Sequence, residues 1–437
     1  MEQSEKELLT LLKKGIAPAT GCTEPIAVAY AVAAAKEKIK GNLQKMIIQV
    51  DSNIYKNGLM VTIPGTTRKG LVSAAAFGFV TGDAQKKLMV IAGITNEDIR
   101  KAQELIDQKR IEVILNREST GLDIQATLLT DSDKARVNIR ESHLNIVHSE
   151  ATDLHHAFTP LKQTTETTHH LNHRIQAYTL KDLLRFSEET LLETFRFLQD
   201  GITMNLRIAR EGLTIKSGVA ATLNELIKEG TMADNLITRA QVLCAAASEA
   251  RMSGSRLPVM STAGSGNHGI TVFLSNYAVA EKKNLPEERL LRALALANLI
   301  TYFIKSYTGT LSAMCGCGVA AGIGASAGIV YLLGGDEQQM LGALYNMVGS
   351  ISGMICDGAK DGCAYKLALA SGWAVQSALL SLKGAIIHPN DGIVDPDFKQ
   401  LFKNLGHVCD PGMTATDQAI LDVMLNMTDG PCSERVD

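Results

Sequence analysis

Residues Leu311 to Gly335 contain no charged side chain and are rich in glycine, alanine and serine. A run of this length is long enough to span a bilayer as a helix. However, glycine, serine and two cysteines dilute its apolar character, and no cluster of lysine or arginine flanks it as a topology signal. We therefore expect a helix, continuous or broken, that packs tightly inside a large helical core, and we expect no membrane partner.

The chain has 437 residues, which is enough for two to three domains and a large buried core. Its net charge of −3 gives no basic excess to match a phosphate backbone, so we expect no nucleic-acid partner. The charged, amphipathic first residues lack the apolar segment of a secretory signal. We therefore expect a cytoplasmic protein whose eight cysteines are metal ligands, nucleophiles or core residues. The sequence is compatible with a homo-oligomer.

Segments rich in β-branched residues predict strands in the first third of the chain. They cover residues 46–52, 59–64, 111–116, 123–130, 133–140 and 143–149. Between them, residues 94–110 predict a helix capped by Thr95 or Asn96. Residues 41–155 are therefore expected to form a smaller mixed α+β domain, inserted after an N-terminal helix at residues 1–40 that packs with the catalytic domain.

The remainder of the chain, residues 156–437, is expected to be a helical catalytic domain with buried Gly/Ala-rich helices, so the fold class is α+β. Residues 151–176 indicate a connector or exposed loop. Residues 179–201 predict one amphipathic helix that ends at Gly201. Five histidines of the connector lack a helical metal-ligand spacing and are interpreted as loop residues: His155, His156, His169, His170 and His173.

Four cysteines cluster in the helical part, each with a glycine within two residues: Cys315, Cys317, Cys356 and Cys363. Three thiolates without a matching histidine spacing favour a [4Fe–4S] cluster over zinc, because C-x-x-C pairs are absent. An iron without a protein thiolate could then bind substrate. The alternative is that these are buried core cysteines. Cys244 is expected in the core, and Cys432 is an alternative further ligand in the tail that also holds Cys409.

Cys22 lies just before a segment, Thr23-Glu24-Pro25, that predicts the start of a helix with Thr23 at the cap. A helix N-terminus lowers the pKa of a thiol, so a thiolate is plausible here. A thiolate at this position could act as a general base. The alternative is a small residue packed at a turn beside Gly21.

Residues 258–269 read PVMSTAGSGNHG, and such a run of small residues leaves backbone N–H groups free to hold a carboxylate. It is neither a P-loop nor a dinucleotide fingerprint. His268 is a candidate proton carrier, although a lone histidine is more often structural. Lys56 and Asn57 could bind a substrate carboxylate or amine, and the alternative is a solvated hairpin turn. No lysine has a convincing pyridoxal phosphate context.

Five motifs occur in series: ATGCTEP, NIYKNGLMVTIPGT, STAGSGNHG, LSAMCGCGVAAG and ICDGAKDGCAYK. In this order, from about Gly15 to Gly384, the chain resembles the L-cysteine desulfidase family, which is related to the alpha chain of iron–sulfur L-serine dehydratases. The spacing of the last two cysteines is shorter than in serine dehydratases, and the Ser-Ser-Ser-His motif of those enzymes is absent. This departure puts serine as the main substrate in doubt.

The resemblance implies an oxygen-sensitive [4Fe–4S] cluster held by Cys315, Cys356 and Cys363, with Cys317 as an alternative first ligand. It implies Cys22 as the proton acceptor. It also implies substrate contacts by residues that match the small-residue loop, namely Ser261, Ser265 and Asn267. Lys56 and Asn57, beside Gly58, are added as the candidates named above for a substrate carboxylate or amine.

The expected function is α,β-elimination of L-cysteine to sulfide, ammonia and pyruvate, with the cluster as Lewis acid. A small-molecule amino acid is thus the expected partner. One alternative is L-serine dehydration on the same cluster. The other is a non-catalytic or membrane-associated helical protein whose cysteines are merely packed.

Overall fold

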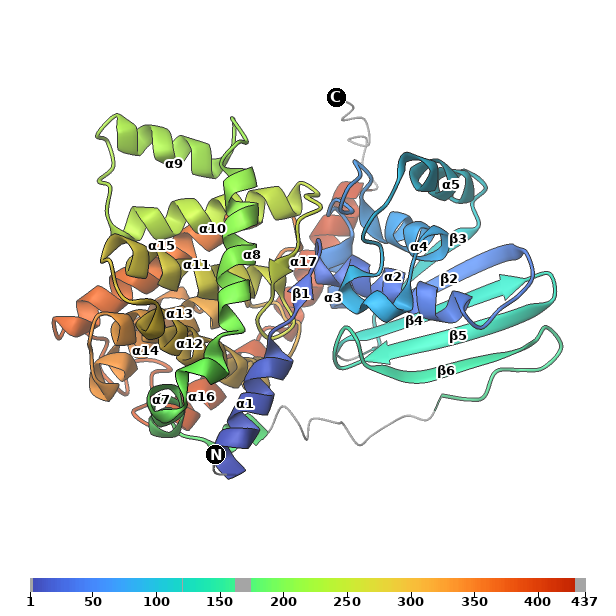
Figure 1. Cartoon of the computed structure of the whole chain (residues 1–437). Coiled ribbons are helices and arrows are strands. Elements are labelled where there is room, and N and C mark those ends of the chain that lie inside the picture. Colours follow the sequence, from blue (N-terminus) through green and yellow to red (C-terminus); the bar gives the residue numbers. More distant parts are fainter. Residues whose placement is uncertain (1–2, 120, 162–173, 429–437) are drawn as a thin grey trace.

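The computed structural model describes residues 3–119, 121–161 and 174–428. Two bodies lie side by side in Figure 1, a helical body and a smaller body built on a five-stranded sheet. The expected α+β class, with mainly helical content, is confirmed.

The smaller body takes its elements from the first 153 residues of the chain. They are α2 (Thr23–Lys36), β2 (Leu43–Asp51), α3 (Ser52–Gly58), α4 (Gly70–Val80), η1 (Ala84–Met89), α5 (Asn96–Asp107), β3 (Ile111–Asn116), β4 (Asp123–Thr130), β5 (Asp133–Arg140) and β6 (Ile146–Asp153). The strand order is β3-β2-β4-β5-β6, in which β2 and β3 are parallel and the other neighbours are antiparallel. The parallel pair requires a long crossover, which α3, α4 and α5 supply.

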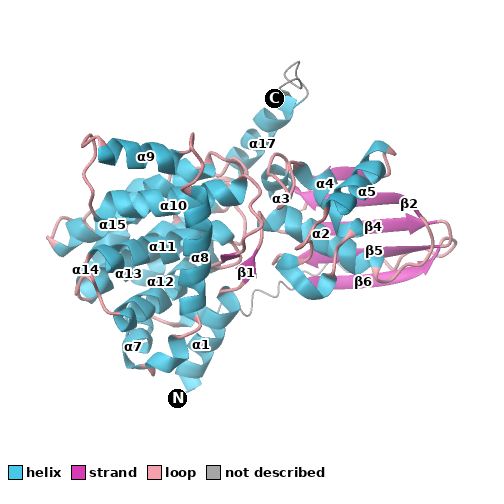
Figure 2. Cartoon of the chain, turned by 45° about the horizontal axis from the view of Figure 1, so that its top comes forward, coloured by secondary structure: helices cyan, strands magenta, loops and turns pink. Residues whose placement is uncertain are grey.

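One face of this sheet forms the core of the smaller body. Ala126 on β4 lies opposite Ile48 on β2 and Val137 on β5, and all three side chains are buried. Because successive strand residues point to opposite faces, this register puts one apolar row against the helices. Helices α2 and α4 cover that face, as Figure 2 shows. The Thr95 side chain caps α5 in a reciprocal capping box with Asp98, as the sequence predicts.

The larger body contains α1 and the elements after the connector. They are α1 (Gln3–Gly15), β1 (Pro18–Ala19), η2 (Ile175–Ala177), α7 (Leu180–Glu189), η3 (Leu192–Phe195), α8 (Leu198–Gly212), α9 (Val219–Lys228), α10 (Leu236–Met252), β7 (Val259–Met260), α11 (Gly266–Lys282), α12 (Glu287–Thr308), α13 (Ala320–Leu332), α14 (Glu337–Ile351), α15 (Cys363–Leu382) and α16 (Phe398–Cys409). A last helix, α17 (Thr414–Thr428), reaches α3 of the smaller body. The short strands β1 and β7 pair antiparallel.

Helix α13 comes from the uncharged stretch and lies among α11, α12, α14 and α15. A Cβ at Gly324 would lie 2.1 Å from Thr301 Oγ1 of α12, and one at Gly328 would lie 2.5 Å from Asn276 Oδ1 of α11. The glycines therefore allow the helix backbones to approach closely. The expected core helix is confirmed, and no helix in the described part of the chain is long and apolar enough to cross a membrane.

Two predicted elements are wrong. Residues 59–64 form a loop rather than a strand, closed by the Thr62–Lys69 bridge, because Val61 packs with Cys22 and Met252 and Ile63 is buried in the core of the smaller body. Residues 179–201 do not form one helix, since the chain breaks into α7, η3 and the start of α8. Gly201 lies inside α8, where a Cβ would meet the Phe273 ring at 2.4 Å, so this glycine serves close packing rather than a helix end.

The first 40 residues divide between the two bodies. Helix α1 packs in the helical core, whereas α2 packs against the sheet. The expected assignment of residues 1–40 to the helical domain therefore fits α1 alone. The reason is that α2 is apolar on nearly all sides and needs full enclosure, which the sheet face and α4 provide.

Candidate active site

A cavity opens where the two bodies meet, with an empty volume of about 480 Å³ that includes its mouth. The smaller body contributes the start of α2 and the end of α3. The helical body contributes the end of α10, the start of α11 and two cysteine-bearing loops. The side chains and backbone that line it belong to Cys22, Thr23, Glu24, Asn57, Arg251, Ser265, Asn267, Cys315, Cys317, Cys356, Gly358, Ala359, Cys363, Lys366 and Leu367.

Backbone hydrogen bonds hold the two cysteine loops together. The Cys315 N–H donates to Met354 O at 2.8 Å, and the Cys356 N–H donates to Ala313 O at 2.6 Å. This short antiparallel pairing places Cys315 beside Cys356 although they are far apart in sequence. Cys363 enters from the first turn of α15. The structure thus brings the three predicted ligands and Cys317 to one cavity.

The thiols at this cavity affect one another electrostatically, and none of those described forms a disulfide. The interaction with Cys317 lowers the pKa of the Cys315 thiol, whereas the same interaction and burial raise the pKa of Cys317. Burial, with the charge of Cys315, raises the pKa of Cys356 to about 12. Cys315 is therefore the thiol of its pair that ionises more readily.

The donor set distinguishes a cluster from a single ion. Among the described residues, no three His, Cys, Asp or Glu side chains are close enough to hold one metal ion. A zinc site needs its sulfur ligands about 2.3 Å from one point, so this arrangement does not support zinc. An iron–sulfur cube takes each thiolate on a different iron. Soft, unpaired thiols around a shared cavity fit such a cluster.

Cys22 and Glu24 form a buried pair at the start of α2. The Cys22 thiol donates to Glu24 Oε2 at 2.8 Å, and the Asn57 amide donates to Glu24 Oε1 at 3.2 Å. His143, from the β5–β6 turn, lies 3.9 Å from Glu24 Oε1 through Nε2. The carboxylate is thus surrounded by three groups that can stabilise its charge.

The electrostatics of this pair correct the expectation for Cys22. Burial, and then the neighbouring Glu24, raise the pKa of Cys22 well above its usual value. Burial alone would raise the pKa of Glu24, but His143, the Cys22 thiol and Arg251 together lower it. The cap position is Cys22 itself, with no side-chain cap hydrogen bond, and Thr23 is the first helical residue. The resting pair is therefore a neutral thiol and a carboxylate.

Three of the five predicted substrate residues line the cavity: Asn57, Ser265 and Asn267. Lys56 does not, because its fully buried ammonium pairs with Asp417 of α17. The predicted hairpin turn is also wrong, since Lys56 and Asn57 belong to α3. Ser261 likewise is not among the lining residues, and its hydroxyl donates to Ala17 O at 2.6 Å. This hydrogen bond ties the β1–β7 junction together.

Sequence reasoning missed Arg251 and Glu24 as cavity residues. Glu24 belongs to a segment whose pattern predicts only the start of a helix. Arg251 lies near the end of α10, which also carries Arg239 and Glu249, and is 3% exposed. The alanine-rich segment before Arg251 predicts a buried helix, and an arginine at the end of a buried helix is the signal that could have revealed it, because burying a charge is costly without a partner.

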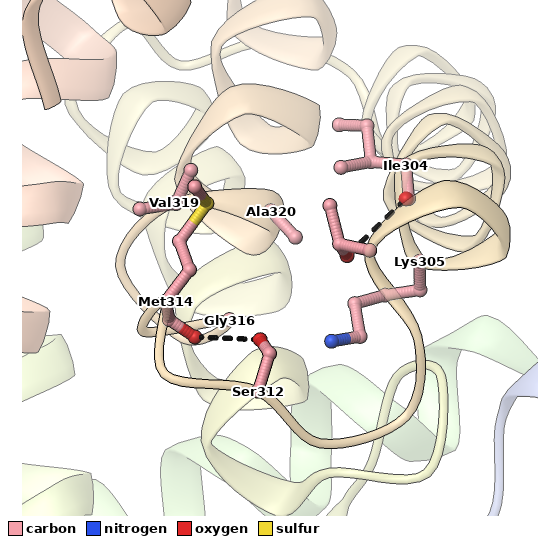
Figure 3. A pocket seen from close by; sticks show the side chains of 8 residues that line it. Ile304, Lys305, Ser312, Met314, Gly316, Val319 and Ala320 are labelled. Atoms are coloured by element: carbon pink, nitrogen blue, oxygen red, sulfur yellow. Dashed lines mark hydrogen bonds between the residues drawn. The ribbon is translucent and has the colours of Figure 1, made fainter. Parts of the chain in front are cut away.

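A second buried polar group, around Lys305, lies behind the cysteine loop. Figure 3 shows Lys305 with its ammonium nitrogen directed toward Ser312, in a small cavity with an empty volume of about 180 Å³. A Cβ at Gly316 would lie 2.5 Å from His268 Nε2 and 3.3 Å from Lys305 Nζ, so the loop packs directly on both side chains. Burial lowers the pKa of Lys305, and burial followed by Lys305 lowers that of His268. His268 is thus neutral, and its Nδ1 lies 3.2 Å from Thr262 O.

Comparisons with known proteins show the family of this chain. The profile of the family described as serine dehydratase alpha chain matches residues 85–422, most of the chain. This chain belongs to the serine dehydratase alpha chain family. It is also 44% identical to a UPF0597 protein of Clostridium tetani over 96% of this chain and 98% of that one. A UPF0597 protein of Caldanaerobacter subterraneus subsp. tengcongensis is 41% identical, over 96% and 99%.

Membership of the serine dehydratase family indicates a lyase-type enzyme with an iron–sulfur cofactor. The matched range includes Cys315, Cys356 and Cys363 but begins after Cys22 and Glu24. The smaller body therefore contributes its half of the cavity from outside that range. The nearly full-length matches to the two UPF0597 proteins cover both halves.

The other predicted features lie away from the cavity. Cys244 is buried in α10, and its thiol contacts Ile270 O at 3.7 Å, which confirms a core position. Cys409 is buried at the end of α16, where its thiol contacts Thr308 O at 3.6 Å. His155 and His156 lie in an exposed turn after β6, as expected. Cys432 and the histidines at 169, 170 and 173 lie outside the described residues.

Proposed function

We propose that this protein catalyses α,β-elimination of L-cysteine to sulfide, ammonia and pyruvate. The observation that carries the proposal is that three thiols fit for a cluster and a thiol–carboxylate pair line one cavity. An elimination of this kind needs both a Lewis acid and a proton acceptor at the same substrate. A reducing cytoplasm would keep these thiols free.

The group that these residues would hold is a [4Fe–4S] cluster. Cys315, Cys356 and Cys363 would bind it, and it would supply Lewis-acid stabilisation of developing negative charge. Cys315 is preferred over Cys317 as the first ligand, because the Cys315 N–H donates to Met354 O in the loop that carries Cys356. Cys317 then lies nearer to α11, with Sγ 3.9 Å from Ser265 Oγ.

In this proposal Cys22 takes the proton from the substrate Cα. Because the resting thiol is protonated, it first passes its own proton to Glu24 Oε2 along their hydrogen bond. The hydrogen bond from Asn57 holds Glu24 in place for this transfer. Loss of hydrosulfide from Cβ then gives 2-aminoacrylate, and water converts this product to pyruvate and ammonia without further help from the enzyme.

L-Serine is the second candidate substrate, because the matching family is named for serine dehydratase. Hydroxide is a much poorer leaving group than hydrosulfide, because O–H acids are far weaker than S–H acids: the pKa of water is about 15.7, and that of a thiol, the nearest sulfur analogue, is about 8.5. Serine would therefore need a proton donor at its hydroxyl, whereas cysteine would not. At the start of α11 the cavity offers only neutral Ser265 and Asn267, which are weak acids, and Lys366 on α15 is the ammonium that lines it.

The test compares sulfide release from L-cysteine with pyruvate release from L-serine, using protein purified and assayed without oxygen. The proposal predicts the larger kcat/KM for L-cysteine. A larger value for L-serine would replace cysteine by serine as substrate. Turnover of neither substrate by protein that holds its cluster would refute the elimination itself.

A further inference from the structure

Arg251 places a buried positive charge at the wall of the cavity. Its side chain is on α10, lines the cavity and is 3% exposed. Its charge lowers the pKa of the Glu24 carboxylate, but no hydrogen bond or salt bridge joins these two side chains in the described part of the chain. A buried charge without a salt-bridge partner is unfavourable, so an anionic ligand would stabilise it.

Two contacts fix the plane of the guanidinium and leave further donors available. Nη1 donates to Asn267 Oδ1 at 2.9 Å, and Nη2 donates to the backbone oxygen of Gly21. The Nε–H is buried and has no hydrogen-bond partner in the structure. A guanidinium carries five N–H donors in a rigid fork, and only two of the Arg251 donors have these acceptors.

The surrounding backbone makes room for this guanidinium and adds to its field. A Cβ at residue 266 would lie 2.6 Å from Arg251 Nε, so only glycine leaves space there. Gly266 also begins α11, and the preceding Ser265 gives no side-chain cap. The unpaired N–H groups and the positive dipole end of this 17-residue helix therefore lie beside Arg251 at the cavity wall.

We infer that Arg251, together with the start of α11, binds the α-carboxylate of the amino-acid substrate. The inference rests on the proposed elimination for the identity of the ligand as an amino acid. Arginine matches a carboxylate because two parallel N–H donors meet its two oxygens. The contact of Nη2 with Gly21 puts this site next to Cys22, so a carboxylate held here brings its Cα–H toward the Cys22 sulfur.

The closing experiment measures binding rather than turnover. L-Alanine has the α-carboxylate but no leaving group, and L-alaninamide has the same side chain without the negative charge. Isothermal titration of the anaerobically purified full chain with each compound gives two dissociation constants. The variants are Arg251→Gln and Arg251→Lys, with Arg256→Gln as the matched control because Arg256 is exposed and lies five residues further on.

Wild-type protein and Arg256→Gln are expected to bind L-alanine at least about 10-fold more tightly than L-alaninamide. Arg251→Gln is expected to weaken L-alanine binding by about 10- to 100-fold, to abolish the preference, and to keep the iron content of wild type. Arg251→Lys keeps the charge but not the planar fork of N–H donors. Its affinity for L-alanine should therefore lie between those of wild type and Arg251→Gln.

The inferred carboxylate site is wrong if Arg251→Gln still prefers L-alanine over L-alaninamide as strongly as wild type does. It is also wrong if wild type binds both compounds equally. Loss of iron from Arg251→Gln and Arg251→Lys with an unchanged preference would instead assign Arg251 to charge compensation of the cluster, and would also overturn it. If wild type does not cleave L-cysteine yet shows the Arg251-dependent preference, the proposed elimination fails and the carboxylate site stands.

Discussion

At the scale of single residues, Cys22 and Glu24 form one hydrogen-bonded pair. The thiol donates to a carboxylate whose charge Asn57 and His143 support, so neither residue can be assigned a protonation state without the other. This arrangement differs from an isolated thiolate at a helix N-terminus. In the proposed mechanism the carboxylate is the place where the thiol proton goes.

Substitution of Cys22 tests its role directly. Cys22→Ala removes the proton acceptor, and we expect the turnover of L-cysteine to fall by at least about 100-fold while the cluster absorbance stays. Cys244→Ala is the matched control, because Cys244 is equally buried but lies in the helical core. Near-wild-type turnover by Cys22→Ala protein with an intact cluster would rule out Cys22 as the base.

The contribution of Asp51 to the free energy of unfolding depends on pH. Asp51 caps α3, which carries Asn57, and burial raises its pKa to about 6 from 3.8. Because the folded pKa lies above the unfolded one, the folded state binds more protons between about pH 4 and pH 6, and this contribution to stability is lost as pH rises through 6. Its size is up to roughly 3 kcal/mol.

We therefore expect Asp51→Asn to remove part of the gain in stability that wild type shows between pH 7 and pH 5. Thermal unfolding of both proteins at the two pH values measures the difference. Asp83→Asn is the control, since Asp83 also caps a helical turn but is 43% exposed. The same pH response in wild type and Asp51→Asn would contradict the raised pKa.

At the scale of elements, α17 connects the end of the described chain to the smaller body through two ion pairs. Lys56 pairs with Asp417 in a buried environment, whereas Arg117 pairs with Asp422 at 2.7 Å in an exposed one. Breaking a buried pair leaves an uncompensated charge and costs about 3–5 kcal/mol. Breaking an exposed pair costs at most about 1 kcal/mol.

Lys56→Met should therefore destabilise the protein far more than Arg117→Met, and the double change Lys56→Met with Asp417→Leu should recover much of the loss. Denaturant unfolding of the three variants gives the free energies. Equal effects of Lys56→Met and Arg117→Met would show that burial of the first pair does not determine its strength.

Helix α13 depends on its glycines for its position at the centre of the helical body. Gly324→Ala would force a Cβ to within 2.1 Å of Thr301 Oγ1, and overpacking of this kind costs about 1–3 kcal/mol. Gly353→Ala meets no atom within 4 Å and serves as control. We expect a lower melting temperature for Gly324→Ala alone. Equal melting temperatures would mean that α12 and α13 can separate at little cost.

The elements were predictable where local patterns determine them. The Thr95 cap of α5 and the strand β4 are encoded within a few residues, and both are confirmed. Residues 59–64 have the composition of a strand, yet burial of Val61 and Ile63 outside any strand overrides it. Glycine is a common stop signal, so the sequence predicts a helix end at Gly201, and the packing that places it inside α8 depends on Phe273, which is distant in sequence.

At the scale of the whole molecule, the cavity is assembled from two bodies, and this limited what the sequence could reveal. Motif spacing indicated Cys22, Asn57 and the cysteine loops, and the structure brings them to one place. The pairing of Cys22 with Glu24 depends on burial at the interface, which no local pattern encodes. Lys56 pairs with Asp417 and Arg251 donates to the backbone oxygen of Gly21, and both partners lie far away in the sequence.

In the proposed function the thiols at this interface hold an iron–sulfur cluster that acts on an amino acid. The iron and sulfide content and the visible absorbance test this in wild type, Cys356→Ala, Cys363→Ala and Cys244→Ala proteins purified without oxygen. We expect about four irons per chain in wild type and Cys244→Ala, and loss of cluster and of L-cysteine turnover in the other two. Colourless, iron-free wild-type protein, or Cys356→Ala and Cys363→Ala proteins with full iron content, would contradict it.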